Sequence, residues 1–278
     1  MRRIAALWEL SRPGNLAITA LSVVVGTGGQ LGSADITTIA GAVVSAMLIA
    51  AGGNAHNDYY DRTIDALNRP GRPLPSGRIS PGAAQIFGFA VYALGVAIGW
   101  GLGSQLGGVA TLVALLLWLY AARGKRMGWS GNLLIAVICS LAFIYGGLAA
   151  GNPVLAVFPA GFALLMHMAR EILKDVQDLS GDRASGALTL PINSGVERAL
   201  GVAAWCLLGL VLLSPVPYLM GVYNVKYLAA VILGVDLVLL PIIYQLLNDP
   251  WGADPAKLSL VLKLDMLAGL MAVALGLS

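Results

Sequence analysis

The sequence predicts an all-α membrane protein of about nine transmembrane helices that forms a single domain over residues 1–278. Hydrophobic residues make up 58% of the chain and charged residues only 11%, whereas soluble domains have roughly 25% charged residues. The apolar residues fall into runs long enough to cross a bilayer, and nearly all basic residues lie in alternate connections between those runs. These three observations place the chain in a membrane.

The apolar runs match the length of about 17 to 25 residues that a bilayer-crossing helix needs. No cleavable signal pattern accompanies the first run, so we expect its helix to be retained. The runs predict helices over residues 15–31, 37–58, 83–103, 106–122, 131–150, 154–173, 199–217, 225–247 and 258–276.

The basic residues predict how the helices are oriented. If the N-terminus faces the cytoplasm, the connections 61–81, 123–130, 174–198 and 248–257 face it too. Of the 17 Lys and Arg residues, all but Lys226 and Lys263 then lie on that side or within one turn of it. The positive-inside rule therefore predicts a multi-pass protein of the cytoplasmic membrane with its polar chemistry on the cytoplasmic side. A net charge of +3 that arises in this way predicts no nucleic-acid partner.

Two acidic motifs with the same spacing, D-x-x-D-x-x-x-D, lie at the ends of the second and sixth predicted helices. Their aspartates are Asp58, Asp61 and Asp65 in the first motif and Asp175, Asp178 and Asp182 in the second, and Asn57 extends the first motif by an amide. In a helix, positions i, i+3 and i+7 lie within about 60° of one another. Each motif therefore predicts one row of carboxylates, if the motif is helical.

Carboxylates gathered at one membrane face require cations, because a single aspartate at the centre of a membrane helix costs about 2.5–3.5 kcal/mol on insertion scales. Carboxylate and amide oxygens suit Mg²⁺, which usually binds one or two carboxylates together with substrate phosphates. The paired motifs therefore predict a site for a diphosphate bridged by Mg²⁺. The aspartates could instead be solvated helix ends, but the duplicated spacing disfavours this interpretation. They could also belong to a cation pathway, but their position at the helix ends disfavours that function.

The residues of both motifs closely resemble the UbiA superfamily of intramembrane prenyltransferases. The resemblance rests on Asn57-Asp58-x-x-Asp61-x-x-x-Asp65, on Asn68-Arg69-Pro70-Gly71-Arg72-Pro73-Leu74-Pro75-Ser76-Gly77, and on Lys174-Asp175-x-x-Asp178-x-x-Gly181-Asp182. It implies helices around a central cavity with two Mg²⁺ ions and an isoprenyl diphosphate held between the motifs. The implied metal ligands are Asn57, Asp58, Asp61, Asp65, Asp175, Asp178 and Asp182, of which Asp61, Asp65, Asp178 and Asp182 are expected to be catalytic.

A diphosphate also needs cationic donors, because the leaving group gains charge as its bond to carbon breaks. Tyr120 begins a segment similar to the family's Tyr-x-x-x-x-Lys. The expected diphosphate ligands are Arg69, Arg72, Tyr120, Lys125, Arg126 and Lys174. Arg12-Pro13-Gly14-Asn15 is similar to the family's Arg-Pro pair at the first helix, where Arg12 and Asn15 would bind the acceptor or simply begin the helix.

The combined motifs, with Gly186-Ala187-x-Thr189-Leu190-Pro191, are most similar to the archaeal-type digeranylgeranylglyceryl phosphate synthase branch of this superfamily. The resemblance implies Mg²⁺-dependent transfer of a prenyl group, expected to be geranylgeranyl, from its diphosphate to a lipophilic acceptor. The expected acceptor is geranylgeranylglyceryl phosphate, in membrane ether-lipid biosynthesis, and no obligate protein partner is implied. Prenylation of an aromatic acceptor such as 4-hydroxybenzoate is the alternative within the family. A cation-coupled transporter is a distant alternative that the basic loops beside the acidic motifs disfavour.

Overall fold

The computed structural model describes residues 2–30, 35–124 and 127–277, and within these ranges it contains helices and no strands. Eight spans in this part of the chain are long and apolar enough to cross a membrane. They are α3 (Ile36–Tyr60), α5 (Pro81–Leu102), α6 (Ser104–Arg123), α7 (Trp129–Ala149), η3 with α8 (Pro153–Ala156 and Val157–Gln177), α11 with α12 (Val196–Leu213 and Val216–Leu219), α13 with η4 and α14 (Val225–Val231, Ile232–Asp236 and Leu237–Asn248), and α15 (Pro255–Gly276).

Each predicted run overlaps one of these spans or the shorter apolar helix α2 (Pro13–Gly26), so the predicted all-helical membrane fold is confirmed. The prediction of a helix over 15–31 was too long. Beyond Gly26 the chain turns through Gly28 and Gly29, whose φ angles of 65° and 77° lie in the left-handed region that glycine tolerates. A further helix that the sequence pattern did not predict, α1 (Arg2–Ser11), precedes α2.

Local residues fix where several of these helices begin. The Ser80 side chain accepts a hydrogen bond from the backbone of Ala83 before α5, and Asp254 accepts from the backbone of Ala256 and Lys257 before α15. Both helices also have proline at their first position, where the missing N–H costs nothing. Local capping therefore sets where α5 and α15 begin.

Three hydrophobic clusters lie within the described residues, and the two larger ones hold the long helices together. One packs α3, α5, α6 and α7 through residues such as Ile49 and Tyr92, and the other packs α8, α11, α14 and α15 through residues such as Leu173 and Leu262. Between them, α2 approaches α7 very closely, because a Cβ at Gly26 or Gly146 would overlap a backbone carbonyl of the facing helix. Close approach through small residues is a common way of packing membrane helices.

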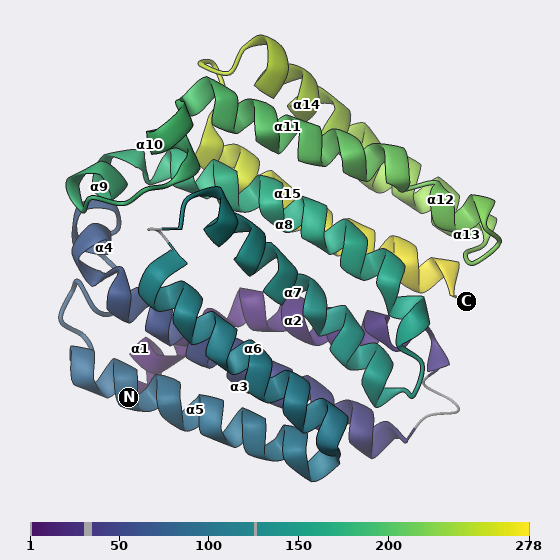
Figure 1. Ribbon diagram of the computed structural model, residues 1–278, viewed down its shortest axis with the longest axis horizontal. Coiled ribbons are helices and arrows are strands. Elements are labelled where there is room, and N and C mark those ends of the chain that lie inside the picture. The colour runs from purple at the N-terminus through teal and green to yellow at the C-terminus, as the bar shows by residue number, and fades with distance from the viewer. Residues whose placement is uncertain (1, 31–34, 125–126, 278) are drawn as a thin grey trace.

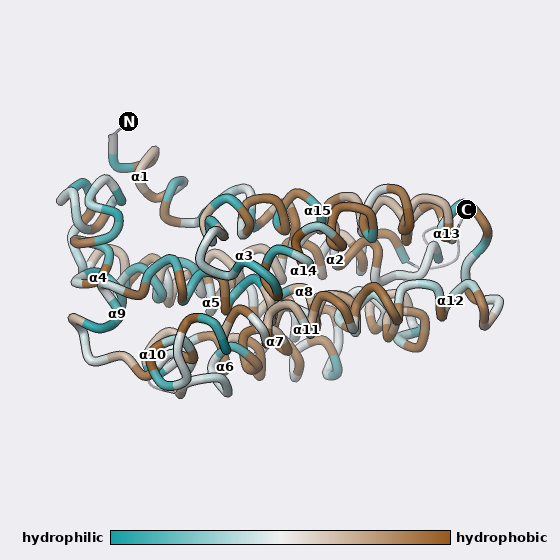
Figure 2. The backbone as a smooth tube through the Cα atoms, turned by 90° about the horizontal axis from the view of Figure 1, so that it is seen from above, coloured by the Kyte–Doolittle hydropathy of each residue, from teal (hydrophilic) through white to brown (hydrophobic). Residues whose placement is uncertain are grey.

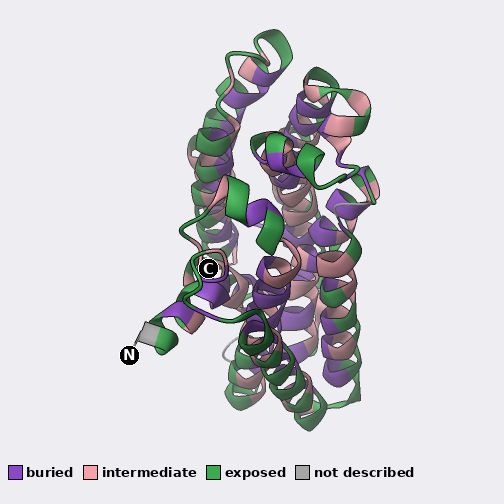
Figure 3. Cartoon of the chain, turned by 90° about the vertical axis from the view of Figure 1, so that its left-hand side faces the viewer, coloured by how far each residue is buried: buried purple, intermediate pink, exposed green. Residues whose placement is uncertain are grey.

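Three short helices lie together at one end of the bundle. Figure 1 places α4 (Arg62–Asn68), α9 (Leu179–Ala184) and α10 (Leu190–Ser194) at the end where the N-terminus lies, far from the C-terminus. Many hydrophilic residues lie at this end in Figure 2, whereas the long helices are mainly hydrophobic. Figure 3, which looks at this end, shows exposed residues on the outer faces and buried ones between the helices. This polar end carries both acidic motifs.

Candidate active site

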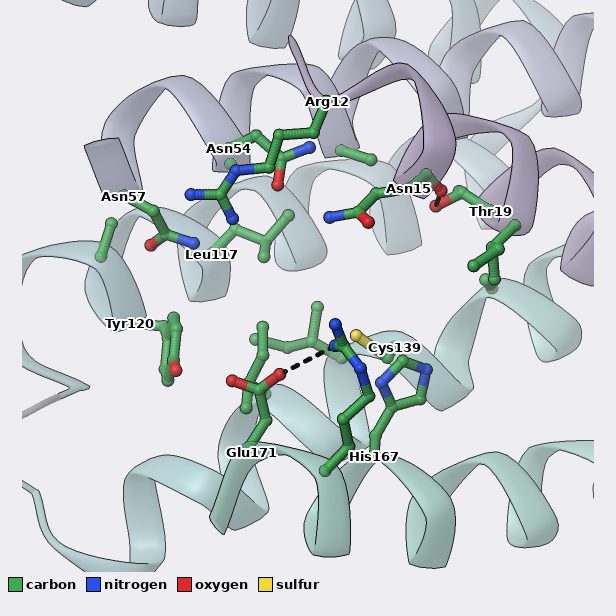
Figure 4. A pocket seen from close by; sticks show the side chains of 18 of the residues that line it. Arg12, Asn15, Thr19, Asn54, Asn57, Leu117, Tyr120, Cys139, His167 and Glu171 are labelled. Carbon is green, nitrogen blue, oxygen red and sulfur yellow. Dashed lines mark hydrogen bonds and ion pairs between the residues drawn. The ribbon is translucent and has the colours of Figure 1, made fainter. Parts of the chain in front are cut away.

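A cavity of about 440 Å³ lies between α2, α3, α6, α7, α8 and α15. Apolar residues such as Val113 and Ile138 line part of its wall, and charged residues line the rest. In Figure 4, Arg12 and Asn15 lie on one side of this cavity and face Glu171 and His167 on the other. The cavity therefore combines a charged region with an apolar one, as a site for a lipid with a charged head requires.

The first acidic motif bends at its middle aspartate. Helix α3 ends at Tyr60, Asp61 has φ −85° and ψ 3°, and α4 begins at the next residue. Backbone hydrogen bonds continue across the bend, from Asp61 N to Asn57 O at 2.9 Å and from Asp65 N to Asp61 O at 2.7 Å. The single row of carboxylates, expected on the condition that the motif is helical, therefore does not form on one helix, because Asp65 lies on the separate short helix α4.

The second motif bends at the corresponding position. Helix α8 ends at Gln177, Asp178 has φ −92° and ψ 7°, and α9 follows directly. The hydrogen bond from Asp178 N to Lys174 O measures 2.9 Å and that from Asp182 N to Asp178 O measures 3.0 Å. The two motifs thus share their backbone course as well as their spacing, and each places its third aspartate on the short helix beyond the bend.

The bend divides the seven predicted metal ligands into two groups. Four line the cavity and three are buried behind its lining, with at most 3% of the residue exposed. The cavity-lining ligands are Asn57, Asp61, Asp175 and Asp178, and the buried ones are Asp58, Asp65 and Asp182. Each motif therefore presents two oxygen-bearing side chains to the cavity.

Arginines neutralise the buried carboxylates of the first motif. Asp58 is paired with Arg12 and, at 3.3 Å, with Arg72, which also lies 2.6 Å from Asp65. Burial raises the pKa of Asp65, and Arg72 opposes that shift. Arg12 is the one residue other than glycine with a positive φ in the described ranges, at 55°. Such strain costs about 1 kcal/mol or more and persists where surrounding contacts hold the residue in place.

The connection over residues 61–81, here called the first polar loop, also contacts the second motif. Arg69 donates to Asp178 Oδ1 at 2.8 Å, and Asn68 donates to the backbone carbonyl of Asp178 at 3.5 Å. Gly181 on α9 faces Asn68 so closely that a Cβ there would clash with the amide. Residues that follow the first acidic motif therefore connect it directly to the second motif.

The remaining predicted residues fall mostly at the cavity. Arg69, Arg72, Tyr120 and Lys174 line it, as do Arg12 and Asn15. Lys174 forms an ion pair with Glu171 at 2.6 Å. Lys125 and Arg126 lie outside the described residues.

Sequence reasoning assigned no role to three polar residues that the structure brings into contact with the site. Asn132 on α7 donates to Asp175 Oδ2 at 2.9 Å, Glu171 lies between Arg170 and Lys174, and Lys263 on α15 donates to Asn15 Oδ1 at 2.8 Å. A signal for Lys263 was present, because an ionisable residue within a membrane span indicates function by default. Asn132 offered no comparable signal.

The donor set suits a hard cation that arrives with an anionic ligand. Within the described residues, no three carboxylate, imidazole or thiol side chains are grouped as a self-sufficient metal site. Mg²⁺ usually takes one or two carboxylates and completes its shell with waters and substrate phosphates. The oxygen pairs Asn57 with Asp61 and Asp175 with Asp178 fit that mode of binding.

Solved structures share this fold. A digeranylgeranylglyceryl phosphate synthase structure has a TM-score of 0.78 and 29% identity, and the match covers all of this chain and 99% of that one. A UbiA homologue from Aeropyrum pernix has a TM-score of 0.76 and 18% identity over 92% of this chain and 97% of its own. A UbiA homologue from Archaeoglobus fulgidus, bound to GPP and Mg²⁺, has a TM-score of 0.64 and 19% identity over 97% and 99%.

Curated relatives match over nearly the whole length. The digeranylgeranylglyceryl phosphate synthase of Methanopyrus kandleri is 39% identical over 96% of this chain and 97% of its own. That of Natronomonas pharaonis is 37% identical over 99% and 98%. The sequence profile of the UbiA prenyltransferase family matches residues 15–267. With this fold, and with a match that includes both acidic motifs, the chain belongs to the UbiA prenyltransferase family and is a prenyltransferase.

Proposed function

We propose that this prenyltransferase transfers a geranylgeranyl group from its diphosphate to geranylgeranylglyceryl phosphate and so forms digeranylgeranylglyceryl phosphate. The observation that carries the proposal is the near full-length identity of 37–39% to relatives named for this product. The cavity supports it, because acidic and basic side chains line one region and apolar side chains another. Such a lining suits two lipids that both have anionic heads.

The cavity-lining carboxylates and the Asn57 amide would hold Mg²⁺ with the donor diphosphate, and the metal would draw negative charge from the leaving group. Mg²⁺ binding by a homologue of the same fold agrees with this assignment. Arg69, Arg72 and Lys174 supply further positive charge from the protein itself. We propose that two Mg²⁺ ions bind there.

The reaction replaces one bond at C1 of the prenyl chain. The C1–O bond to the diphosphate breaks, the allylic cation is delocalised, and the acceptor hydroxyl oxygen forms the new C1–O bond. The hydroxyl proton passes to a nearby carboxylate or to the departing diphosphate. The side chains orient the two lipids and exclude water, and Tyr120 offers an aromatic face at the cavity wall. Arg12 and Asn15 are the proposed acceptor contacts.

Kinetics with purified protein and labelled geranylgeranyl diphosphate test the choice of acceptor. We expect kcat/KM for geranylgeranylglyceryl phosphate to exceed that for 4-hydroxybenzoate at least tenfold, a difference of about 1.4 kcal/mol in transition-state binding. Efficient prenylation of 4-hydroxybenzoate without product from the glycerol phosphate lipid would replace the proposed acceptor with an aromatic one.

We also propose that the polar end faces the cytoplasm, as the distribution of basic residues indicates. A cysteine introduced at the exposed Ser76 in the first polar loop should react with a membrane-impermeant thiol reagent only when the cytoplasmic face is accessible. Reaction in intact cells would reverse the proposed orientation.

A further inference from the structure

Lys263 is a cation within a membrane-spanning helix, and the partner that holds it is neutral. It lines the cavity from α15 and donates to Asn15 Oδ1 at 2.8 Å. Arg12, Arg170 and Lys174 also line this cavity, and Asn15 is the only side-chain partner of Lys263 among the described residues. An ammonium group in a membrane is costly unless it is paired. The position of Lys263 therefore favours an anion that the protein itself does not supply.

Arg170 lies beside Lys263 and is only weakly neutralised. Its Nε donates to the carbonyl oxygen of Ser259, one turn before Lys263 on α15, at 3.3 Å. Its terminal nitrogen is 3.6 Å from Glu171, whereas Lys174 approaches the same carboxylate to 2.6 Å. Glu171 is thus mainly the counter-ion of Lys174. Arg170 and Lys263 together leave about two positive charges at the junction of α8 and α15.

Helix α2 completes this cluster from the opposite side of the cavity. Asn15 accepts from Lys263 through its oxygen, which leaves its amide nitrogen as a donor at the cavity wall. Arg12 precedes it and pairs with Asp58 of the first acidic motif. Arg12 is therefore shared between the acidic region and the basic cluster.

From this geometry we infer that Lys263, with Arg170 and Asn15, forms an anion subsite separate from the diphosphate site, and that it binds the phosphate monoester head of the acceptor. The inference rests on the proposed function for the identity of that acceptor. Two net positive charges match a phosphate monoester, which carries nearly two negative charges at neutral pH, better than a single carboxylate. Lys263 would thereby discriminate a glycerol phosphate lipid from an aromatic acid.

Equilibrium binding tests this subsite without catalysis. Purified protein in lipid nanodiscs would be titrated with labelled geranylgeranylglyceryl phosphate in the absence of the donor. A parallel titration would use geranylgeranylglycerol, which lacks the phosphate. We expect Lys263→Met to weaken binding of the phosphate lipid about 10- to 100-fold and to leave binding of the alcohol unchanged. Lys263→Arg, which keeps the charge, should retain most of the affinity.

Lys257→Met is the matched control, because Lys257 lies on the same helix, is exposed and does not line the cavity. It should bind both lipids as the unmodified protein does, and the KM for geranylgeranyl diphosphate should stay within about twofold in Lys263→Met. Equal losses for the phosphate lipid and the alcohol, unchanged affinity for both, or a raised donor KM would each overturn the subsite. Failure of the unmodified protein to use the phosphate lipid would instead overturn the proposed function.

Discussion

The two acidic motifs share their spacing and their bend, but they differ in how their charge is compensated. In the first motif, the buried Asp58 and Asp65 pair with Arg72 from the adjoining loop, and Asp58 also pairs with Arg12. In the second, Asp175 accepts a hydrogen bond from the neutral Asn132, and Asp178 receives its arginine from the loop after the first motif.

This difference shows that the duplicated motifs are not independent units. Arg12, Arg69 and Arg72 all lie within the first 72 residues of the chain, and Arg69 reaches from there to Asp178 of the second motif. In the first motif, Arg72 from the following segment pairs with both buried aspartates, whereas in the second motif Asp178 takes its arginine partner, Arg69, from the segment after the first motif. Mutations at equivalent positions of the two bends should therefore have similar effects, whereas mutations of the side chains that contact the aspartates should have different effects in the two motifs.

The largest and most symmetrical effect should come from the middle aspartates. Because Asp61 and Asp178 both lie at the bend and line the cavity, Asp61→Ala and Asp178→Ala should each lower kcat/KM by about 10³-fold or more. Release of labelled diphosphate at saturating Mg²⁺ measures the loss, with thermal unfolding as the control for folding. Activity within tenfold of normal in either variant would contradict equal roles for the two motifs.

The next comparison separates stability from binding. Arg72→Met leaves two carboxylates, each with a 4% exposed side chain, without this cation, and should cost about 3 kcal/mol of stability. Arg69→Met leaves Asp178, which lines the cavity and can be hydrated there, so it should cost less than about 1.5 kcal/mol. Thermal unfolding in one detergent compares the two. Equal destabilisation would show that the second motif is as dependent on its arginine as the first.

A moderate effect should follow from loss of the neutral donor in the second motif. Asn132→Leu removes the hydrogen bond to Asp175 and should lower kcat/KM about tenfold, as expected for a hydrogen bond to a charged group. Asn132→Ser, which can restore a donor through water, should recover part of the activity. If Asn132→Leu retains full activity, Asp175 does not need this contact to act.

The smallest effect should occur at the exposed pair outside the cavity. Arg78 donates to Glu9 at 2.6 and 3.0 Å and lowers the pKa of Glu9 through this hydrogen bond. A carboxylate with a lowered pKa stabilises the fold above its unfolded-state pKa and loses that contribution as the pH falls through its folded-state pKa. Glu9→Gln should therefore cost less than about 1 kcal/mol at pH 7 and progressively less as the pH falls through the lowered folded-state pKa of Glu9. Unfolding curves recorded from pH 7 downward test this, and a loss that does not change with pH would exclude the ion pair as the cause.

The membrane fold could be predicted from the sequence because hydropathy and helix length are properties of contiguous residues. Every predicted run overlaps a helix, and the spacing of the aspartates revealed two equivalent motifs. The bends at Asp61 and Asp178 could not be predicted, because the backbone hydrogen bonds continue through them and no proline or glycine occupies either position. Helix α1 escaped prediction because it is short and carries arginines at its start.

The sequence by itself determined the class of fold, the expected donor chemistry and the seven candidate metal ligands, since membrane length and oxygen ligands can be recognised locally. The seven candidates are Asn57, Asp58, Asp61, Asp65, Asp175, Asp178 and Asp182. Only the tertiary structure decided which carboxylates face the cavity and which are buried with arginines. It alone joined Arg69 to Asp178 and placed Lys263 beside Asn15. Such contacts depend on helices that are distant in the chain, and the strength of an electrostatic interaction depends on distance and burial rather than on sequence order.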